Sequence, residues 1–428
     1  MKKHRIYVLI ILVLVVLIGG LLLYKKKDKV EEPPTQGDPI KVVTTSDFDL
    51  NIIKQVNKDT KENYMISPLS IAYALTILKE GAEGNTLTEI NNVLGDYRLT
   101  GMINIKDRIS IANLLFIKNK WKNDINSDYI KTIQDKYSSD LIFDEFTTPD
   151  AVNNWVSDKT FKMIPNALSS IDPEFVLGIA NAIAIDVEWD NKFECNRTHE
   201  GDFTLENGTK LKTAYMNGSN DVVYLENSKA KGIIKDYAPY DMTTGEKAYE
   251  NTPNKIELEY IAILPNGNVQ EYVNNFTKKD LNDLIKTGKS ASSDLKIRYS
   301  LPKYKYDYDY GTLKEGLINL GIKDAFSPEA SSFGKMVNKN SDLKVYLDTA
   351  IHKSHIEITE NGTKAAAVTI LMMFEATAIE KEPKIINIEF NKPFIYIIKE
   401  KNSDNIWFFG TVYTPIKWED NVTECNYE

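Results

Sequence analysis

Apolar and polar positions recur along this chain with two periods, and the changes between the periods predict its elements. Helical spacing, with capping residues at the ends, predicts helices at Phe48–Asn57, from Pro68 to about Leu78, from Thr86 to Gly95, from Asn153 onward and at Leu313–Phe326. Alternating or continuous apolar runs predict strands at Ser110–Lys118, Val176–Val187, Ile256–Leu264 and Leu295–Tyr304, and a hairpin at Phe203–Met216 that turns at Asn207-Gly208. Both kinds of element occur throughout, so the sequence predicts a mixed α/β (α+β) fold.

The stretch from Glu360 to Phe390 carries two competing signals. At period two, one face holds only small or apolar residues, namely Thr363, Ala365, Ala367, Thr369, Leu371 and Met373. Three consecutive alanines make a poor strand, however, and the Glu380–Pro383 segment behind them is charged and ends in proline. The stretch could therefore remain an exposed loop, and it could also fit into a sheet. The plainer alternative is a buried strand followed by a surface loop.

The flanks of this stretch predict strands on both sides. Residues 343–363 alternate between apolar and polar positions and run into Glu360-Asn361-Gly362-Thr363, where Gly362 gives the backbone a hinge. Residues 390–415 contain two apolar runs separated by the polar turn Lys401–Asn405.

The amino-terminal residues differ from the rest of the chain in their distribution of charged and apolar residues. A basic flank at residues 1–5 precedes residues 6–24, which are apolar and uncharged for nearly the length that crosses a bilayer as a helix. No clear cleavage site follows, which favours an uncleaved membrane anchor over a removed signal segment. Lysines lie on both sides of the span, so charge does not fix the topology, and we expect the large domain on the extracellular side on functional grounds. Residues 25–45 are polar and proline-containing, as in a linker.

Composition narrows the class of protein. The 428 residues are 42% hydrophobic and 26% charged, which is a globular balance, and the net charge of −9 argues against nucleic acid as a partner. The two cysteines, Cys195 and Cys425, could form one bridge or remain free thiols.

Enzyme chemistry finds little support. The chain has four histidines, no G-x-S-x-G segment, no zinc-ligand spacing and no phosphate-binding loop. We therefore expect neither an enzyme nor a metal or other cofactor.

Three motifs in the carboxy-terminal third resemble those of the serpins: E-x-G-T-x-A-A-A at Glu360–Ala367, F-N-K-P-F at Phe390–Phe394 and F-x-G-x-V-x-x-P at Phe408–Pro415. The segments I-S-P-x-S-I at Ile66–Ile71 and L-G-I-x-x-A-F at Leu320–Phe326 are also serpin-like, so the resemblance spans about 370 residues. It implies a domain at residues 46–415 with a large central sheet, two smaller sheets, about nine helices and an exposed reactive-centre loop at about 360–390. Residues 416–428 would form a carboxy-terminal tail.

The resemblance also implies roles for particular residues. Ser67, Ser70, Asn181 and His352 would form a polar cluster under the central sheet, with His352 bonded to Asn181 and Ser70. Trp189 would lie at the top of that sheet, where Lys303 would pair with Glu360. Helix capping and ordinary core packing are the plainer readings of the serines and of Trp189. On a surface, the Lys303–Glu360 pair would contribute only about 0–1 kcal/mol and would serve to position the hinge.

The function implied by the resemblance is irreversible inhibition of a serine or cysteine protease by a monomer. The protease would attack the loop, form an acyl-enzyme and be trapped when the cut loop enters the central sheet. The hinge residues Ala365, Ala366 and Ala367 favour this reading, because nothing charged or prolyl occurs from Ala365 to Phe374. A non-inhibitory serpin that acts as a binding protein or chaperone at the cell surface is the alternative.

The position of the cut is predicted by family spacing. Sixteen residues after Glu360, the scissile bond would join Ala376 and Thr377, which suits an elastase-like protease with a small specificity pocket. Counting back from the F-N-K-P-F strand points further downstream. Phe374–Glu375 is another candidate and would suit a chymotrypsin-like protease.

Overall fold

The structure is a computed structural model that describes residues 41–43, 46–58, 60–100, 103–311, 313–348, 350–363, 383–401 and 403–421. Two compact units divide the chain, Met1–Pro33 and Pro34–Glu428, and every described residue belongs to the second. The anchor predicted at residues 6–24 lies outside the described residues. Among those that are described, no helix has both the length and the apolar character needed to cross a membrane.

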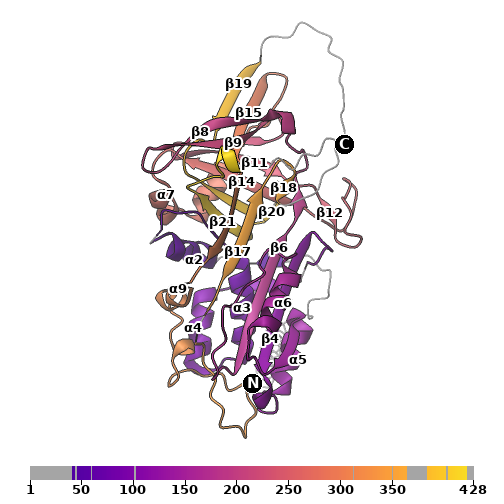
Figure 1. The fold of residues 1–428 in the computed structure, drawn as a ribbon, viewed down its shortest axis with the longest axis vertical. Helices are drawn as coiled ribbons and strands as arrows, with labels where there is room; N and C mark the ends of the chain where they lie inside the picture. Colours follow the sequence, from indigo (N-terminus) through magenta and orange to yellow (C-terminus); the bar gives the residue numbers. More distant parts are fainter. Residues whose placement is uncertain are drawn as a thin grey trace, which may run out of the picture. The chain divides into compact units, whose positions relative to one another are not determined.

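Eight α-helices occur in the described part of the chain, where the sequence predicted about nine in all (Figure 1). They are α2 (Phe48–Asn57), α3 (Pro68–Gly81), α4 (Gly84–Leu94), α5 (Ser127–Tyr137), α6 (Asp150–Lys159), α7 (Val269–Asn275), α8 (Lys278–Ile285) and α9 (Leu313–Leu320), with 3-10 turns at Asn119–Trp121, Cys195–Arg197, Asp324–Phe326 and Trp418–Asp420.

Local chemistry explains where these helices begin and end. The Ser67 side chain accepts a hydrogen bond from the backbone N–H of Ser70, and Pro68 opens α3 as predicted. Gly95, with a φ of 63°, ends α4. The predicted helix Leu313–Phe326 is wrong in its second half, because Gly321 adopts a φ of 120° and its N–H bonds back to Leu317.

Two large sheets form the end of the domain that carries β19 and β15 (Figure 1). The six-stranded sheet has the order β10 (Val223–Glu226), β11 (Ala230–Asp236), β14 (Leu258–Pro265), β20 (Phe394–Glu400), β21 (Ile406–Val412) and β2 (Tyr64–Ile66). The four-stranded sheet has the order β19 (Lys384–Glu389), β15 (Leu295–Pro302), β9 (Lys210–Ser219) and β8 (Thr198–Thr204). Two short pairs lie outside these two sheets, β1 (Lys41–Val43) with β3 (Arg98–Thr100) and β12 (Tyr240–Asp241) with β13 (Lys255–Ile256).

The central sheet is in two parts. One part has the order β16 (Tyr304–Asp309), β17 (Lys353–Ile358), β18 (Gly362–Thr363) and β7 (Val187–Glu188). The other has the order β5 (Asp140–Asp144), β4 (Ile109–Lys118) and β6 (Leu177–Ile185). A single residue, Asp186, separates β6 from β7, so these two strands form one continuous wall that belongs to both parts.

The long strand predicted across residues 343–358 is confirmed only for its last six residues. Its partner β16 is six residues long and pairs with Lys353–Ile358 alone. The residues before Lys353 alternate in polarity but have no described strand beside them, so the pattern there does not produce a strand.

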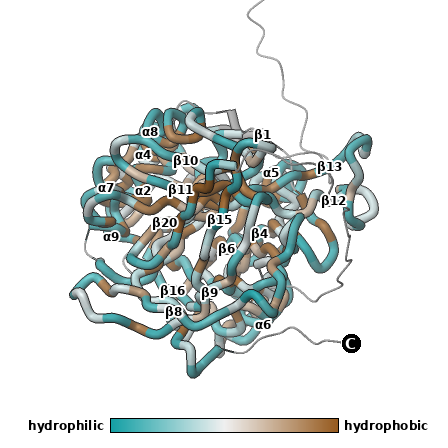
Figure 2. Tube along the Cα trace, turned by 90° about the horizontal axis from the view of Figure 1, so that it is seen from above, coloured by the Kyte–Doolittle hydropathy of each residue, from teal (hydrophilic) through white to brown (hydrophobic). Residues whose placement is uncertain are grey.

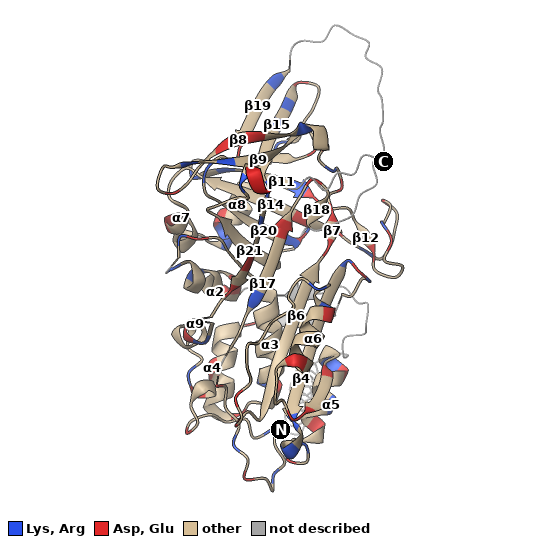
Figure 3. Cartoon of the chain, viewed as in Figure 1, with Lys and Arg blue, Asp and Glu red and all other residues tan. Residues whose placement is uncertain are grey.

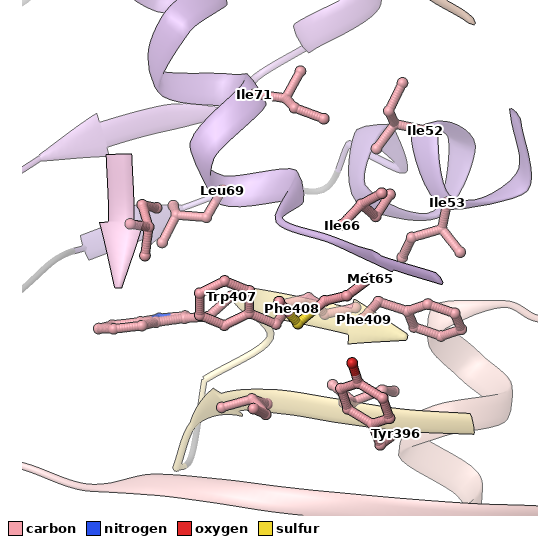
Figure 4. Packing of buried hydrophobic residues seen from close by; sticks show 14 of the residues in the cluster. Ile52, Ile53, Met65, Ile66, Leu69, Ile71, Tyr396, Trp407, Phe408 and Phe409 are labelled. Atoms are coloured by element: carbon pink, nitrogen blue, oxygen red, sulfur yellow. The ribbon is translucent and has the colours of Figure 1, made fainter. Parts of the chain in front are cut away.

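The core lies between the six-stranded sheet and the first two helices. Figure 4 shows Leu69 of α3 and Ile53 of α2 next to the aromatic residues of β21, of which Trp407 is fully buried. Hydrophobic residues concentrate on inner strands such as β20, β11 and β15, and the outer loops are hydrophilic (Figure 2). This packing gives the two-part central sheet a rigid base.

Candidate functional site: the slot between β6 and β17

The first hinge residues already lie inside the central sheet. Thr363 pairs with Ile358 of β17 on one side and with Val187 of β7 on the other, and Gly362 lies opposite Glu188. A Cβ atom on Gly362 would lie 2.2 Å from the carbonyl oxygen of Val187. Only glycine fits such a close approach, so the hinge glycine lets the two backbones meet.

A buried ion pair anchors the turn that precedes the hinge. Glu360 Oε2 lies 3.0 Å from Lys303 Nζ, and the hydroxyl of Thr198 donates a 2.8 Å hydrogen bond to Glu360 Oε1. The side chains of Glu360 and Lys303 are 1% and 2% exposed. The expectation of a surface pair is therefore wrong. A buried pair holds its geometry more firmly, because losing one partner leaves a charge without water.

Trp189 connects β7 to the same turn. Its backbone N–H donates to the carbonyl of Asn361 at 2.9 Å, and its indole N–H donates to the carbonyl of Thr359 at 3.0 Å. The indole stacks on Tyr237 with 4.6 Å between ring centroids. The Tyr237 hydroxyl lies 2.7 Å from the hydroxyl of Thr363. These contacts fix where the chain enters the sheet.

Beneath Trp189 lies a buried lysine that sequence reasoning missed. Lys235 is 1% exposed, and its ammonium group donates to Asp221, Tyr299 and the carbonyl of Asn191. The same group lies over the Trp189 ring, 5.6 Å from its centroid. Burial lowers the pKa of Lys235 although Asp221 opposes the shift. The lysine therefore supports the tryptophan from below through a cation–π contact.

Below Thr363 the described strands leave a gap in the central sheet between β6 and β17. Among the described strands, β6 pairs only with β4, so its edge toward β17 has no partner. The groove between β6 and β17 has a volume of about 510 Å³. Its lining is mainly apolar and comes from β6, β17, α3, α6 and the segment 160–175. No charged residue occurs on β6 (Figure 3), so the groove suits an uncharged strand.

Four polar residues predicted to meet under the sheet do lie together at this groove, but with different partners. His352 Nε2 accepts a 3.0 Å hydrogen bond from the backbone N–H of Ser67. Asn181 instead accepts from the Ser70 hydroxyl at 2.5 Å and donates to Asn113 at 2.7 Å. The expected bond from His352 to Asn181 and Ser70 is therefore wrong. Burial lowers the pKa of His352 from 6.5 to about 4, which keeps the ring neutral as this acceptor role requires.

The remaining predicted positions cannot be placed. Ala365, Ala366 and Ala367 of the hinge lie outside the described residues, as do both candidate cuts, Ala376–Thr377 and Phe374–Glu375. Cys195 is disulfide-bonded in the structure, and the only other cysteine, Cys425, also lies outside the described residues.

Comparison with known proteins identifies the family. The family model described as "Serpin (serine protease inhibitor)" matches residues 43–415. The chain is a serpin. A solved structure of the thermophilic serpin tengpin in its native state is 30% identical, with a TM-score of 0.71 over 90% of this chain and 98% of that one. Tengpin in its latent state gives a TM-score of 0.67 at 30% identity over 86% and 96% of the two chains.

Sequence relatives of this serpin include named inhibitors. The leukocyte elastase inhibitor of Bos taurus is 29% identical over 377 residues, which are 82% of this chain and 93% of that protein. The serpin fold predicted from the sequence is thus confirmed, and the family generally contains protease inhibitors and not enzymes.

Proposed function

We propose that this serpin is an irreversible inhibitor of serine proteases that traps its target by inserting the cut loop between β6 and β17. The observation that carries the proposal is the position of β18. Gly362 and Thr363 already occupy the top of the slot, antiparallel to both walls. The chain that follows them has only to continue downward in the same register.

The register identifies the partners of each inserted residue. Thr363 lies opposite Val187, so continuation without a bulge puts Ala365 opposite Ile185 and Ala367 opposite Ile183. The buried Thr363 side chain faces the core, and side chains alternate along a strand. Ala365, Ala367, Thr369, Leu371 and Met373 would therefore face inward, and Lys364 outward. The small and apolar face recognised in the sequence matches the mainly apolar lining of the groove.

Thr369 would meet polar partners in this register. Counting from Val187 puts it opposite Asn181, and counting from Ile358 on the other wall puts it opposite His352. Both polar residues line the slot. A threonine hydroxyl can donate and accept there, so the single inward polar side chain between Ala365 and Met373 would be satisfied.

Strand insertion supplies the driving free energy. Each new backbone hydrogen bond contributes roughly 0.5–1.5 kcal/mol net, and one wall of the slot, β6, is nine residues long. The sum is comparable with the roughly 5–15 kcal/mol by which a domain is stable. The uncut protein would be a kinetically trapped state, and the tether closed through the uncut loop would oppose insertion.

The chemistry begins as ordinary proteolysis. The protease serine attacks the carbonyl carbon of Ala376, an ester forms, and the bond to the Thr377 nitrogen breaks so that Thr377 leaves as an amine. Insertion then carries the acylated protease away before water hydrolyses the ester. A cysteine protease would form a thioester by the same steps.

An elastase-like target is the specific form of the proposal. Alanine at position 376 suits a small specificity pocket, and one 29% identical relative is named leukocyte elastase inhibitor. The Phe374–Glu375 bond would instead select a chymotrypsin-like protease. We further propose that the protein acts as a monomer on the extracellular side of the membrane, held by residues 6–24.

The test is to mix the full chain with elastase-like and chymotrypsin-like proteases and to analyse the products by denaturing gel and intact mass. The proposal expects a stable band near the summed mass and a released peptide that begins at Thr377. A peptide that begins at Glu375 would move the cut to the alternative bond. Complete cleavage without any complex by every protease tested would favour a non-inhibitory binding serpin.

A further inference from the structure

The outer edge of β7 is covered by an unusually long connection. Residues 237–257 join β11 to β14, whereas the preceding connection in the same sheet, from β10 to β11, uses only residues 227–229. The long connection contains the short pair β12–β13, which lies beside β7 and β18 in Figure 3. It therefore covers the outside of the wall that holds the hinge.

The backbone of β7 and of the residue after it, Trp189, makes hydrogen bonds on both edges of the strand. Trp189 donates to Asn361 on the hinge side. On the outer side, the carbonyl of Glu188 accepts a 2.8 Å hydrogen bond from the N–H of Ala238, and the N–H of Glu188 donates to the Tyr240 hydroxyl at 3.3 Å. The start of the connection thus acts as a further strand edge, and β7 is held between it and the hinge.

A cluster of ion pairs also joins the long connection to β7. The Glu188 carboxylate lies 2.5 Å from Lys247 Nζ and 3.1 Å from Lys192 Nζ, and its side chain is 8% exposed. Burial would raise the pKa of Glu188, but the hydrogen bonds from the two lysines outweigh it and hold that pKa below its usual value. The Arg108 guanidinium lies 5.7 Å from the centroid of the Tyr240 ring. The Lys247 side chain is 53% exposed, so it can be replaced without opening the core.

We propose that residues 237–247 are a latch that holds β7 in the position that seats the hinge, with Lys247 as a positioning residue for loop insertion. The proposal rests on the proposed inhibitory function. The latch goes beyond that function, because it makes the long connection between β11 and β14 control how readily insertion starts.

The physical reason is that the first residue pair of an inserted strand costs the most free energy to form. Seating the first residue pair orders backbone on both sides before any further hydrogen bond compensates, whereas each later residue adds bonds to an existing edge. The latch fixes Glu188, which lies directly opposite Gly362, so the first pair is formed before the loop is cut. With the latch loosened, insertion would have to begin by rebuilding this pair, and the acyl-enzyme would have longer to hydrolyse.

The test is Lys247→Met in the full chain, compared with the wild type for the rate and stoichiometry of covalent complex formation. We expect the rate to fall and the stoichiometry of inhibition to rise, each by a factor of about two to five, which is what one partly exposed ion pair can supply. Residue-resolved hydrogen exchange should show faster exchange at the Trp189 amide, which bonds to Asn361. The thermal midpoint should hardly change.

Two further variants provide the controls. Lys247→Arg should restore both readouts. Lys231→Met removes an exposed pair with Glu226, 3.4 Å long, which joins β11 to β10 of the six-stranded sheet, and it should behave as the wild type does. Unchanged kinetics and unchanged Trp189 exchange in Lys247→Met would overturn the latch.

Failure of the inhibitory function would be seen separately. If the wild type traps no protease, the exchange readout alone decides on the latch: faster exchange at Trp189 in Lys247→Met supports it, and unchanged exchange overturns it. The loss of inhibition would then count only against the proposed function.

Discussion

Glu360 and Lys303 form an ion pair that is shielded from solvent on every side. The carboxylate belongs to the turn before the hinge, and the lysine directly follows β15 in the chain, so the pair ties the loop to the upper sheets. Thr198, which begins β8, supplies a second bond to the same carboxylate. The turn before the loop is thus held by Thr198 of β8 and by Lys303, which connects β15 to β16.

Lys303→Met should destabilise the protein by about 3–5 kcal/mol, because Glu360 would remain buried without its counter-charge. Denaturant unfolding measures the loss. The matched control is Lys399→Met, which breaks another buried pair, Lys399 with Glu259 at 2.8 Å. Both variants should lose stability, but only Lys303→Met should speed hydrogen exchange at residues 361–363. Equal exchange in the two variants would mean that the pair does not anchor the hinge.

Thr363→Arg should convert the inhibitor into a substrate. Thr363 is 5% exposed, and its hydroxyl faces Tyr237, so an arginine there would need to bury an unpaired charge or leave the sheet. A denaturing gel with the target protease should show cleaved serpin and little complex. Thr363→Val is the control of similar size, and it should keep most of the trapping. Full trapping by Thr363→Arg would show that insertion does not pass through β18.

Acid should weaken the fold through His352. Its pKa is lowered from 6.5 to about 4, so the unfolded chain takes up the proton first as pH falls. The contribution of the neutral ring is complete above pH 6.5 and is lost between pH 6.5 and 4, at up to about 1.4 kcal/mol per pH unit. His352→Gln lacks this titration. The stability difference between wild type and variant should therefore shrink as pH falls from 7 to 4.5, and a constant difference would exclude a buried neutral His352.

The pH dependence of stability that Asp49 causes should have the opposite sign. This residue of α2 is fully buried, and burial raises its pKa from 3.8 to about 7 despite Lys278 and the Tyr97 hydroxyl. The folded state thus favours the protonated acid, and stability is lost as pH rises from 3.8 to 7. Asp49→Asn should match the wild type at acid pH and exceed it by a growing margin up to about pH 7.

Local sequence signals were sufficient for many elements. The helix Phe48–Asn57 was predicted to the residue, and the serine cap with proline behind it located the start of α3. The period-two pattern of the hinge, with glycine before it, indicated a segment able to enter a sheet, and β18 begins that entry. In each case the information lies within a few neighbouring residues.

Other features depend on partners far away in the sequence. Residues 343–352 alternate like a strand but have no described strand beside them, and alternation carries no information about partners. The contact of Tyr237 with Thr363 joins positions 126 residues apart, and Thr198 reaches Glu360 across 162. Nothing in the local sequence around Tyr237 or Thr198 indicates these contacts. The burial of Lys303 was missed for the same reason, because a lysine is exposed by default until the fold encloses it.

Insertion into the slot can be tested most directly at the backbone of β6, by residue-resolved hydrogen exchange before and after the loop is cut. The N–H of Asp186 donates to Arg108 at the end of β4, so alternate amides along β6 face β4 and those between them face the slot. The backbone amides of Ile179, Asn181 and Ile183 should exchange rapidly in the intact protein and become strongly protected after the cut. Ala180, Ala182 and Ala184, which face β4, should be protected in both states and serve as the internal reference. If the slot-facing amides exchange as fast after the cut as before it, the loop does not enter between β6 and β17, and the trapping mechanism proposed for this serpin is wrong.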